Sequence, residues 1–314
     1  MKMADKIATR EAYGKALAEF GAVYENLVVL DADLAAATKT GVFKKAFPER
    51  FFDCGIAENN MIGVATGMAL AGKIPFASSF AMFAAGRSFE QIRNSIGYPH
   101  NNVKIGATHA GITVGEDGAT HQCNEDIALM RTIPGMVILN PADAVEARLA
   151  VKAAIEHDGP VYLRFGRMAV PTFFDDSYEF QIGKGVKMAD GDDVALIATG
   201  IEVEQAMLAR DILAAEGISA SVINISTIKP LDEELVVAEA KKCGVVVTCE
   251  EHNVIGGLGA AVCECLSEKC PTPVLRVGVN DEFGRSGPAK ELVSYFHLDA
   301  QSIADRAKAA IALK

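Results

Sequence analysis

One carboxylate, Glu58, stands at the boundary between a short apolar segment and a long apolar segment of the chain. Between Glu58 and Lys73, the next charged residue, Thr66 carries the only hydroxyl group. Apolar surroundings favour the neutral form of a carboxyl group, which can then share its proton with a ligand near neutral pH. Glu58 is therefore a candidate for acid–base chemistry. The alternative is a glutamate that only stabilises the start of a helix.

Two histidines bracket a glycine-rich segment further along the chain. His109 lies in the sequence Thr-His-Ala-Gly, and His121 follows Asp117 in the sequence Gly-Glu-Asp-Gly-Ala-Thr-His-Gln. Imidazole groups donate and accept protons near neutral pH, and a carboxylate suits hydrogen bonding to hydroxyl groups. The flanking glycines allow the backbone to approach a ligand closely. Together with Glu58, this segment suggests one half of an active site.

The elements that must position these residues alternate between short apolar segments and helical patterns. The expected strands of the first part cover residues 27–30, 50–53, 74–77, 103–107, 136–139 and 161–163, with helices over 58–72 and 142–156 among those between them. This alternation predicts a parallel sheet with helices on both faces. In such sheets, ligands bind beyond the carboxyl ends of the strands. The candidate residues, together with Phe80, follow predicted strands and should therefore cluster.

The periodic pattern fails between Pro171 and Asp193, where polar and turn-forming residues dominate. We expect a crossing between domains there. A second series follows, with expected strands over 194–198, 220–223, 245–248 and 274–277 and a helix over 202–216. The predicted fold class is α/β, with two domains that each contain a mainly parallel sheet flanked by helices. Their predicted bounds are residues 1–170 and 193–314, with a linker over 171–192.

Composition excludes several classes of partner. The chain has 314 residues and a net charge of −11, which argues against a nucleic-acid surface and against an anionic membrane. Its seven cysteines lack the spacing of a disulfide framework. The N-terminal segment Met1–Lys6 lacks the apolar core of a signal peptide, and no apolar stretch is long enough to span a bilayer. These features predict a cytoplasmic protein that binds neither nucleic acid nor membrane.

Four motifs resemble the C-terminal half of transketolase and occur in the family's order. They are Gly-Ile-Ala-Glu ending at Glu58, Phe-Ala-Met-Phe starting at Phe80, the segment 115–122, and Glu-Glu-His-Asn-Val-Ile-Gly-Gly starting at Glu250. The resemblance covers nearly the whole chain. It implies a pyrimidine-binding domain over residues 1–170, the family's C-terminal domain over 193–314, and thiamine diphosphate as cofactor.

The resemblance also implies which residues contact the cofactor. Glu58 would hydrogen-bond a nitrogen of the aminopyrimidine ring and favour the imino form that removes the thiazolium C2 proton. Phe80 and Phe83 would enclose the pyrimidine, although two phenylalanines three apart otherwise indicate plain helix core. Asp33 would lie near the thiazolium, and Leu34 would wedge beneath the cofactor and hold its bent form.

On the substrate side, the resemblance implies that His109, Asp117 and His121 face the hydroxyl groups of a ketose. Arg164 resembles a phosphate-binding arginine, because its planar guanidinium suits a phosphate terminus; a surface ion pair is the alternative. One position departs from the family's pattern. Gly86 stands where a tyrosine usually completes the aromatic pocket, so the pocket wall must be completed in another way.

Part of the family's cofactor site is missing from this chain. The family binds the diphosphate through Mg²⁺ held by a Gly-Asp-Gly motif, which does not occur in this sequence. The oxygen ligands that Mg²⁺ needs must then come from another chain. We therefore predict one subunit of a split transketolase, paired with an N-terminal subunit that carries the diphosphate and Mg²⁺ site. An α2β2 heterotetramer is expected by analogy with the family's dimer.

The predicted reaction transfers a two-carbon glycolaldehyde unit from a ketose phosphate to an aldose. A 1-deoxyxylulose-5-phosphate synthase-like half is an alternative, although that pattern typically has no histidine at position 109. A 2-oxoacid dehydrogenase β subunit would lack the motif from Asp117 to His121. A non-catalytic regulatory subunit is a further alternative, which the retained Glu58 and the two histidines oppose.

Overall fold

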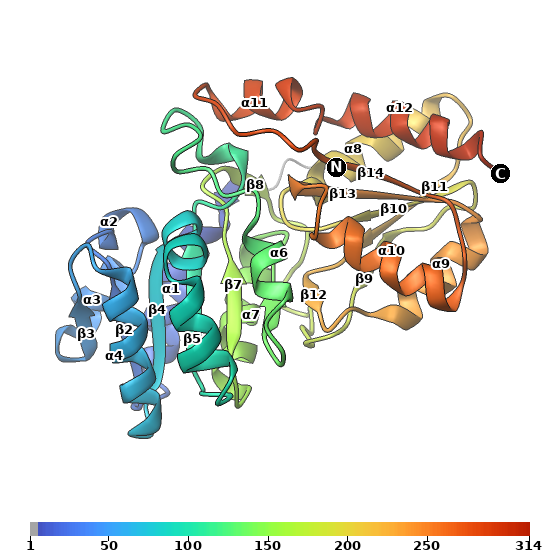
Figure 1. Ribbon diagram of the computed structural model, residues 1–314. Helices are drawn as coiled ribbons and strands as arrows, with labels where there is room; N and C mark the ends of the chain where they lie inside the picture. The colour runs from blue at the N-terminus through green and yellow to red at the C-terminus, as the bar shows by residue number, and fades with distance from the viewer. Residues whose placement is uncertain (1–5) are drawn as a thin grey trace.

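The computed structural model describes residues 6–314, so the signal-peptide expectation falls mainly on residues outside this range. Within residues 6–314 the strands form three sheets (Figure 1). The first sheet contains β12 (Thr227–Lys229), β6 (Val137–Leu139), β7 (Val161–Arg164), β5 (Lys104–Thr108), β4 (Ile74–Phe80), β2 (Leu27–Asp31) and β3 (Phe51–Asp53), in that spatial order. The second contains β14 (Val274–Val279), β13 (Val246–Asn253), β10 (Val194–Ala198), β11 (Ala220–Asn224) and β9 (Val186–Ala189). A small third sheet pairs β1 (Lys6–Ala8) with β8 (Ala169–Pro171).

The helices fill the connections between these strands. They are α1 (Thr9–Gly21), α2 (Ala35–Thr38), α3 (Gly41–Ala46), α4 (Glu58–Leu70), α5 (Phe89–Gln91), α6 (Asp126–Arg131), α7 (Ala144–Glu156), α8 (Glu202–Ala215), α9 (Glu233–Cys243), α10 (Leu258–Lys269), α11 (Ala289–Tyr295) and α12 (Ala300–Ile311). Short 3₁₀ turns cover Pro48–Arg50 and Ile112–Val114, and π-helical segments cover Met82–Arg87 and Ile92–Gly97. No helix within residues 6–314 is long and apolar enough to cross a membrane.

The first sheet is parallel except at one edge. The strands from β3 to β6 pair in parallel, and each of the six strands expected from the sequence in this part is observed. Only β12 runs antiparallel, against β6. The predicted fold class is therefore confirmed.

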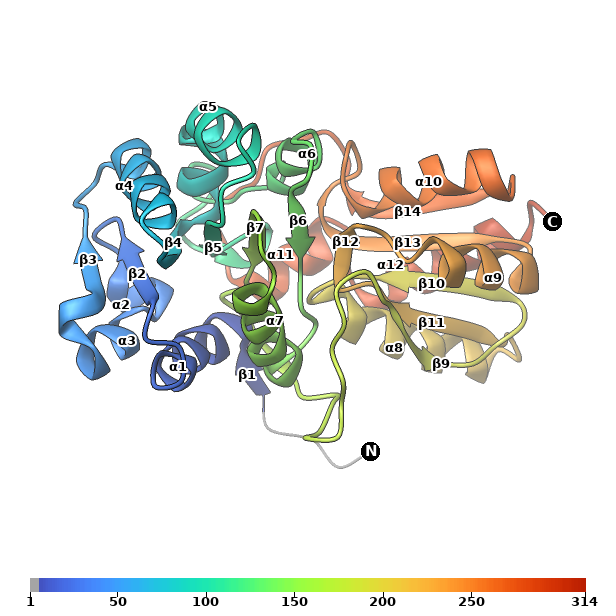
Figure 2. The same ribbon diagram turned by 90° about the horizontal axis from the view of Figure 1, so that it is seen from below.

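Helices cover both faces of the first sheet because its strand residues alternate in direction. Val28 and Leu30 pack in the same apolar cluster as residues of α4 and α6. Leu27 and Val29, their neighbours along β2, pack with α1, α3 and α7. Figure 2 shows α4 and α5 on one side of the strands and α1 and α7 on the other. The buried strands are apolar on both faces, as a doubly covered parallel sheet requires.

The second sheet follows the same plan, with α8 and α12 packed on one face and α9 and α10 on the other. It also corrects one detail of the sequence analysis. The segment 171–192 was expected to be a linker, but its residues Val186–Ala189 form β9, an edge strand antiparallel to β11. Four residues flanked by lysines, glycines and aspartates are too few to show a strand pattern in sequence.

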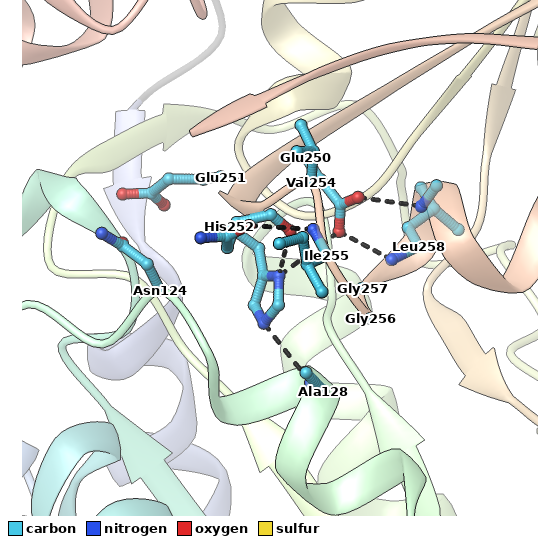
Figure 3. A network of polar contacts seen from close by, with 12 residues as sticks. Asn124, Ala128, Glu250, Glu251, His252, Val254, Ile255, Gly256, Gly257 and Leu258 are labelled. Atoms are coloured by element: carbon cyan, nitrogen blue, oxygen red, sulfur yellow. Dashed lines mark hydrogen bonds and ion pairs between the residues drawn. The ribbon is translucent and has the colours of Figure 1, made fainter. Parts of the chain in front are cut away.

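Polar groups of β13 join the two parts of the chain (Figure 3). The Nε2 atom of His252 accepts a hydrogen bond from the backbone N–H of Ala128 on α6 at 3.3 Å, and its Nδ1 lies 2.6 Å from the carbonyl oxygen of Asn253. Both contacts fit a neutral ring with its proton on Nδ1. Burial accordingly lowers the pKa of His252 to about 4 and raises the pKa of Glu250 and Glu251 to about 7.

Candidate active site at the carboxyl edge of the first sheet

The carboxyl ends of five neighbouring strands carry most of the residues predicted to do chemistry. In spatial order these are Glu58 after β3, Asp33 and Leu34 after β2, Phe80 on β4, His109 after β5, and Arg164 on β7. Parallel strands end at the same edge, so topology alone brings these positions to one side of the molecule. Their side chains, however, do not all point to the same place.

Glu58 is the first residue of α4, and its side chain is only 2% exposed. Its two carboxylate oxygens accept hydrogen bonds from Nη1 of Arg87 at 2.9 and 2.8 Å. The Arg87 side chain is half-exposed, and its guanidinium carbon lies 4.8 Å from the centre of the Phe83 ring. Glu58 therefore lies beneath an arginine that also covers an aromatic face. The sequence motifs indicate Glu58 but not Arg87.

Four rings gather next to this pair. The Phe80 and Phe83 rings are stacked at 5.9 Å between centroids, and the His109 ring stacks on Phe80 at 3.8 Å. The His121 ring meets Phe83 edge-on at 5.4 Å. Residues from β4, from the π-helical segment and from the loop after β5 thus form one aromatic cluster. The structure brings together Phe80, Phe83, His109 and His121 from positions up to 41 residues apart.

The structure shows what fills the place of the expected tyrosine. A Cβ atom at Gly86 would overlap Cε of Met82, so the Met82 side chain occupies that space. Met82, Phe83, Gly86 and Arg87 line one side of a cavity of about 780 Å³. The loop 281–284 of the second domain also lines this cavity. A methionine and an arginine therefore complete the wall where the family has an aromatic ring.

His109 is buried and neutral. Its Nε2 lies 3.0 Å from Nη1 of Arg10, which can only donate, and its Nδ1 lies 2.9 Å from Oγ1 of Thr108. Burial, followed by the charges of Arg10, Arg167 and Lys39, lowers the pKa of His109 to about 3. Both ring nitrogens of His109 therefore have protein partners, and the ring does not titrate near neutral pH as was expected of an imidazole at this position.

Asp33 and Leu34 lie in a loop that is tied to the strand ends. Asp31 accepts hydrogen bonds from the backbone N–H of Leu34 at 2.6 Å and from the hydroxyl of Thr38 at 2.7 Å. Burial raises the pKa of Asp31 to about 6. The Asp53 carboxylate accepts from the backbone N–H of Asp33 at 3.2 Å and also from that of Gly55 on the way to Glu58. These bonds fix the loop carrying Asp33 and Leu34 next to the segment that leads to Glu58.

Asp117 lies in the exposed turn between Gly115 and Gly118, whose φ angles are 88° and 75°. Such positive angles suit glycine and bend the chain sharply. The backbone N–H of His121 bonds the carbonyl of Gly118 at 3.0 Å, which places His121 at the end of this turn. Asp117 is thus on the same turn as His121 and has its side chain in solvent.

Arg164 does not fit the phosphate-binding role predicted for it. Its side chain is 3% exposed, its Nε donates to Asp126 at 2.8 Å, and its Nη2 donates to the carbonyl of Glu251 at 2.8 Å. The hydroxyl of Tyr162 donates to the same Asp126 oxygen at 2.9 Å. Because its donors bond these buried partners, the Arg164 guanidinium links the two domains and is not accessible to a ligand. The surface ion pair considered as the alternative is also wrong, because the pair is buried.

Three other cations, which the sequence analysis did not identify, surround His109. The charges of Arg10, Arg167 and Lys39 all act on this ring. Arg167 is about one-third exposed and pairs with Glu116 at 3.3 Å, and Nη1 of Arg10 also bonds the carbonyl of Ala37 at 2.9 Å. Arg167 follows Arg164 by three residues, just beyond the end of β7. Its position just after a strand end is the sequence feature that could have indicated Arg167 as a site residue.

The donor set around Glu58 fits an aminopyrimidine. The Arg87 guanidinium is a planar group whose N–H donors bond the Glu58 carboxylate and whose face covers the Phe83 ring. An aminopyrimidine ring offers the same two features. For a metal, no group of three or more His, Cys, Asp or Glu side chains within residues 6–314 is placed to hold an ion.

Comparison with known proteins gives the family. Residues 5–172 match the pyrimidine-binding domain of transketolase, and residues 183–303 match the transketolase C-terminal domain. A Methanocaldococcus jannaschii protein named "Putative transketolase C-terminal section" is 53% identical over 95% of this chain and 94% of that protein. The 6-deoxy-6-sulfo-D-fructose transketolase subunit SqwH of a Clostridium species is 45% identical over 94% of this chain and 91% of that protein.

Among solved structures, one described as a split gene transketolase, inactive β4 tetramer, superposes with a TM-score of 0.92. It is 54% identical to this chain and covers 98% of this chain and 99% of its own. Two family domains in their usual order, and relatives matching along nearly the whole length, lead to one conclusion. The chain belongs to the transketolase family and contains that family's pyrimidine-binding and C-terminal domains.

Proposed function

We propose that this chain is the pyrimidine-binding subunit of a split transketolase that moves a two-carbon glycolaldehyde unit from a ketose phosphate to an aldose. The observation that carries this proposal is the buried Glu58 carboxylate beside the stacked rings of Phe80 and Phe83. Bound thiamine diphosphate would supply the carbon nucleophile that accepts and releases the two-carbon unit.

Each of the site residues has a separate role in this proposal. Glu58 would share a proton with a ring nitrogen of the cofactor, because it is a buried carboxyl group whose partner Arg87 also covers the Phe83 ring. Phe80 and Phe83 hold the ring and exclude water from it. Asp33 and Leu34, whose backbone N–H groups bond Asp53 and Asp31, would lie near the thiazolium ring.

The substrate side of the site contains His109, Asp117 and His121. His109 is neutral, and Arg10 donates to its Nε2, so the ring N–H is on Nδ1. We assign this N–H a hydrogen bond to a substrate oxygen, which would replace its contact with Thr108. His121 and Asp117 stand on one turn and are the candidates for contacts with sugar hydroxyl groups. For the phosphate terminus we propose Arg10 and Arg167 in place of Arg164, since these two cations lie beside His109 and are not sealed between the domains.

We propose that a second, N-terminal subunit binds the cofactor diphosphate and Mg²⁺. Two observations support a partner. The sequence has no Gly-Asp-Gly motif, and a relative 54% identical is described as inactive in a tetramer of β subunits alone. An α2β2 assembly remains our proposal by analogy with the family's dimer. We also propose a cytoplasmic location, because the seven cysteines are all free thiols.

Reconstitution tests this function directly. The chain is mixed with a candidate N-terminal subunit, thiamine diphosphate, Mg²⁺, a ketose phosphate and an aldose, and two-carbon transfer is measured. Glu58→Gln should lower turnover by about 10²-fold or more while leaving thermal unfolding nearly unchanged. Glu49→Gln is the matched control, because Glu49 is an exposed glutamate that precedes β3.

Three results would count against the proposal. Near-normal turnover of the Glu58→Gln enzyme would remove Glu58 from the chemistry. Product formed only with pyruvate as donor would favour a 1-deoxyxylulose-5-phosphate synthase-like half. An assembled pair that binds no thiamine diphosphate would indicate a regulatory subunit.

A further inference from the structure

Arg87 contacts both groups that the proposed cofactor site needs from this chain, the Glu58 carboxylate and the Phe83 ring. Its Nη1 atom donates to Oε1 and Oε2 of Glu58, so both carboxylate oxygens already have a partner. Its guanidinium lies 4.8 Å above the Phe83 ring, which is the distance range of a cation–π contact. A pyrimidine ring that bonds Glu58 and stacks against Phe83 would need the same atoms and the same aromatic face.

We propose that Arg87 is a reversible occupant of the pyrimidine site, and that the Arg87–Glu58 pair and the cofactor ring exclude each other. This inference rests on the proposed function, because it assumes that thiamine diphosphate is the ligand of Glu58. Each molecule of cofactor that binds must first break the pair. Arg87 therefore lowers the affinity for cofactor, and it keeps the buried carboxylate paired whenever the ring is not there.

The surroundings of Arg87 allow it to leave. Its side chain is 49% exposed, whereas that of Glu58 is 2% exposed, so the arginine is the partner that moves. It lines the cavity of about 780 Å³, so open space lies next to the guanidinium. The lining of the same cavity includes three carboxylates, Glu125, Asp281 and Glu282. These offer the guanidinium an electrostatically favourable second position.

Local backbone structure holds Arg87 over the ring. The π-helical segment Met82–Arg87 has a wider turn than an α-helix, and such segments occur often at functional sites. Phe83 and Arg87 lie four residues apart, about one turn of this segment, so they share one face. Gly86 has no side chain, and the Met82 side chain lies in the space that a side chain at position 86 would need. A tyrosine at position 86 would stand in the space now used by Met82.

The test measures binding of thiamine diphosphate, with Mg²⁺, to the pair assembled from this chain and its partner subunit. Titration calorimetry gives Kd for the wild-type pair and for Arg87→Gln, which removes the charge but keeps a polar side chain. Since a half-exposed ion pair is worth about 1 kcal/mol, we expect Arg87→Gln to bind about three- to ten-fold more tightly. Arg87→Lys, which keeps the charge without the planar fork, should show a smaller gain.

Arg93→Gln is the matched control. Arg93 is an exposed arginine on the next π-helical segment, and it bonds Asn94 rather than Glu58. Its Kd should equal that of the wild type. A second measurement needs no cofactor: the Arg87→Gln chain should unfold at a lower temperature than the Arg93→Gln chain, because Glu58 loses its partner.

The outcomes separate this inference from the proposed function. If the wild-type pair binds thiamine diphosphate and Arg87→Gln binds equally or more weakly, Arg87 is not an occupant that the ring displaces, although the proposed function stands. If neither the wild-type pair nor any variant binds thiamine diphosphate, the proposed function fails and the inference fails with it. Tighter binding by Arg87→Gln alone supports both.

Discussion

Replacing Glu202 by glutamine should stabilise the protein at neutral pH and destabilise it in acid. Glu202 is the first residue of α8 and is fully buried, and neither of its carboxyl oxygens has a hydrogen-bond partner among residues 6–314. Burial, followed by the nearby charges of Glu251, Asp299 and Glu250, raises the pKa of Glu202 well above its ordinary value of 4.5. The folded chain therefore holds a proton there that the unfolded chain releases.

The pH dependence follows from this difference in bound protons. Because the folded state binds more protons than the unfolded state, the free energy of unfolding falls as pH rises above 4.5. Between pH 4.5 and about pH 7 the free energy of unfolding falls by at most about 3.4 kcal/mol, since each pH unit changes it by about 1.4 kcal/mol. A buried glutamine amide without partners would cost about 1–2 kcal/mol at every pH. The net gain for Glu202→Gln is then at most about 1–2 kcal/mol at about pH 7, and it becomes smaller as the pH falls toward 4.5.

Thermal unfolding of the chain at several pH values between about 4.5 and 8 would measure this gain. About 1–2 kcal/mol corresponds to a rise in Tm of roughly 3–6 °C at about pH 7. Glu234→Gln is the control, because Glu234 is also in the first turn of a helix but has a 90% exposed side chain. If Glu202→Gln shifted Tm by the same amount and in the same direction at every pH, Glu202 would not hold the proton and the reasoning would be wrong.

Two arginines three residues apart should respond in opposite ways to substitution. Arg164→Leu removes the cation that pairs with buried Asp126 and should lower the free energy of unfolding by about 3–5 kcal/mol. Urea denaturation measures this change, and a value below about 1 kcal/mol would contradict the buried pair. Arg167→Gln should change unfolding by about 0.5 kcal/mol or less. In the reconstituted enzyme it should raise KM for phosphorylated ketoses by about ten-fold, with unphosphorylated ketoses unaffected. Equal loss on both kinds of ketose would exclude a phosphate contact for Arg167.

The two arginines also show how residues of one type, three positions apart, can have different surroundings. Arg164 is the last residue of β7, inside a strand that is buried on both faces, so its guanidinium must find partners within the protein. Arg167 lies beyond the strand end, where the chain has left the sheet. Residue type is the same at both positions. Only the position relative to the strand end separates a buried structural cation from one that can reach a ligand.

Glu58, Phe80, Phe83, His109 and His121 were identified from sequence because each stands in a short motif beside a strand or helix boundary. Their convergence follows from the parallel order of β3, β2, β4 and β5, which the alternating pattern predicts. The pairing of Arg87 with Glu58 could not be predicted in this way. It depends on a π-helical segment and on the rotamer of a long side chain, and neither has a sequence period of its own.

The amino-acid sequence by itself determined the layered α/β architecture, the edge of the sheet where chemistry can occur, and the acid and rings that stand there, because periodicity and strand ends are local properties of the chain. The tertiary structure decided which charges face those groups. Burial and the cations around it set the neutral state of His109, the contact with Asp126 made Arg164 structural, and β12 from the second domain completed the first sheet. These outcomes depend on distances and solvent exclusion between segments far apart in sequence, which a linear pattern of residues does not contain.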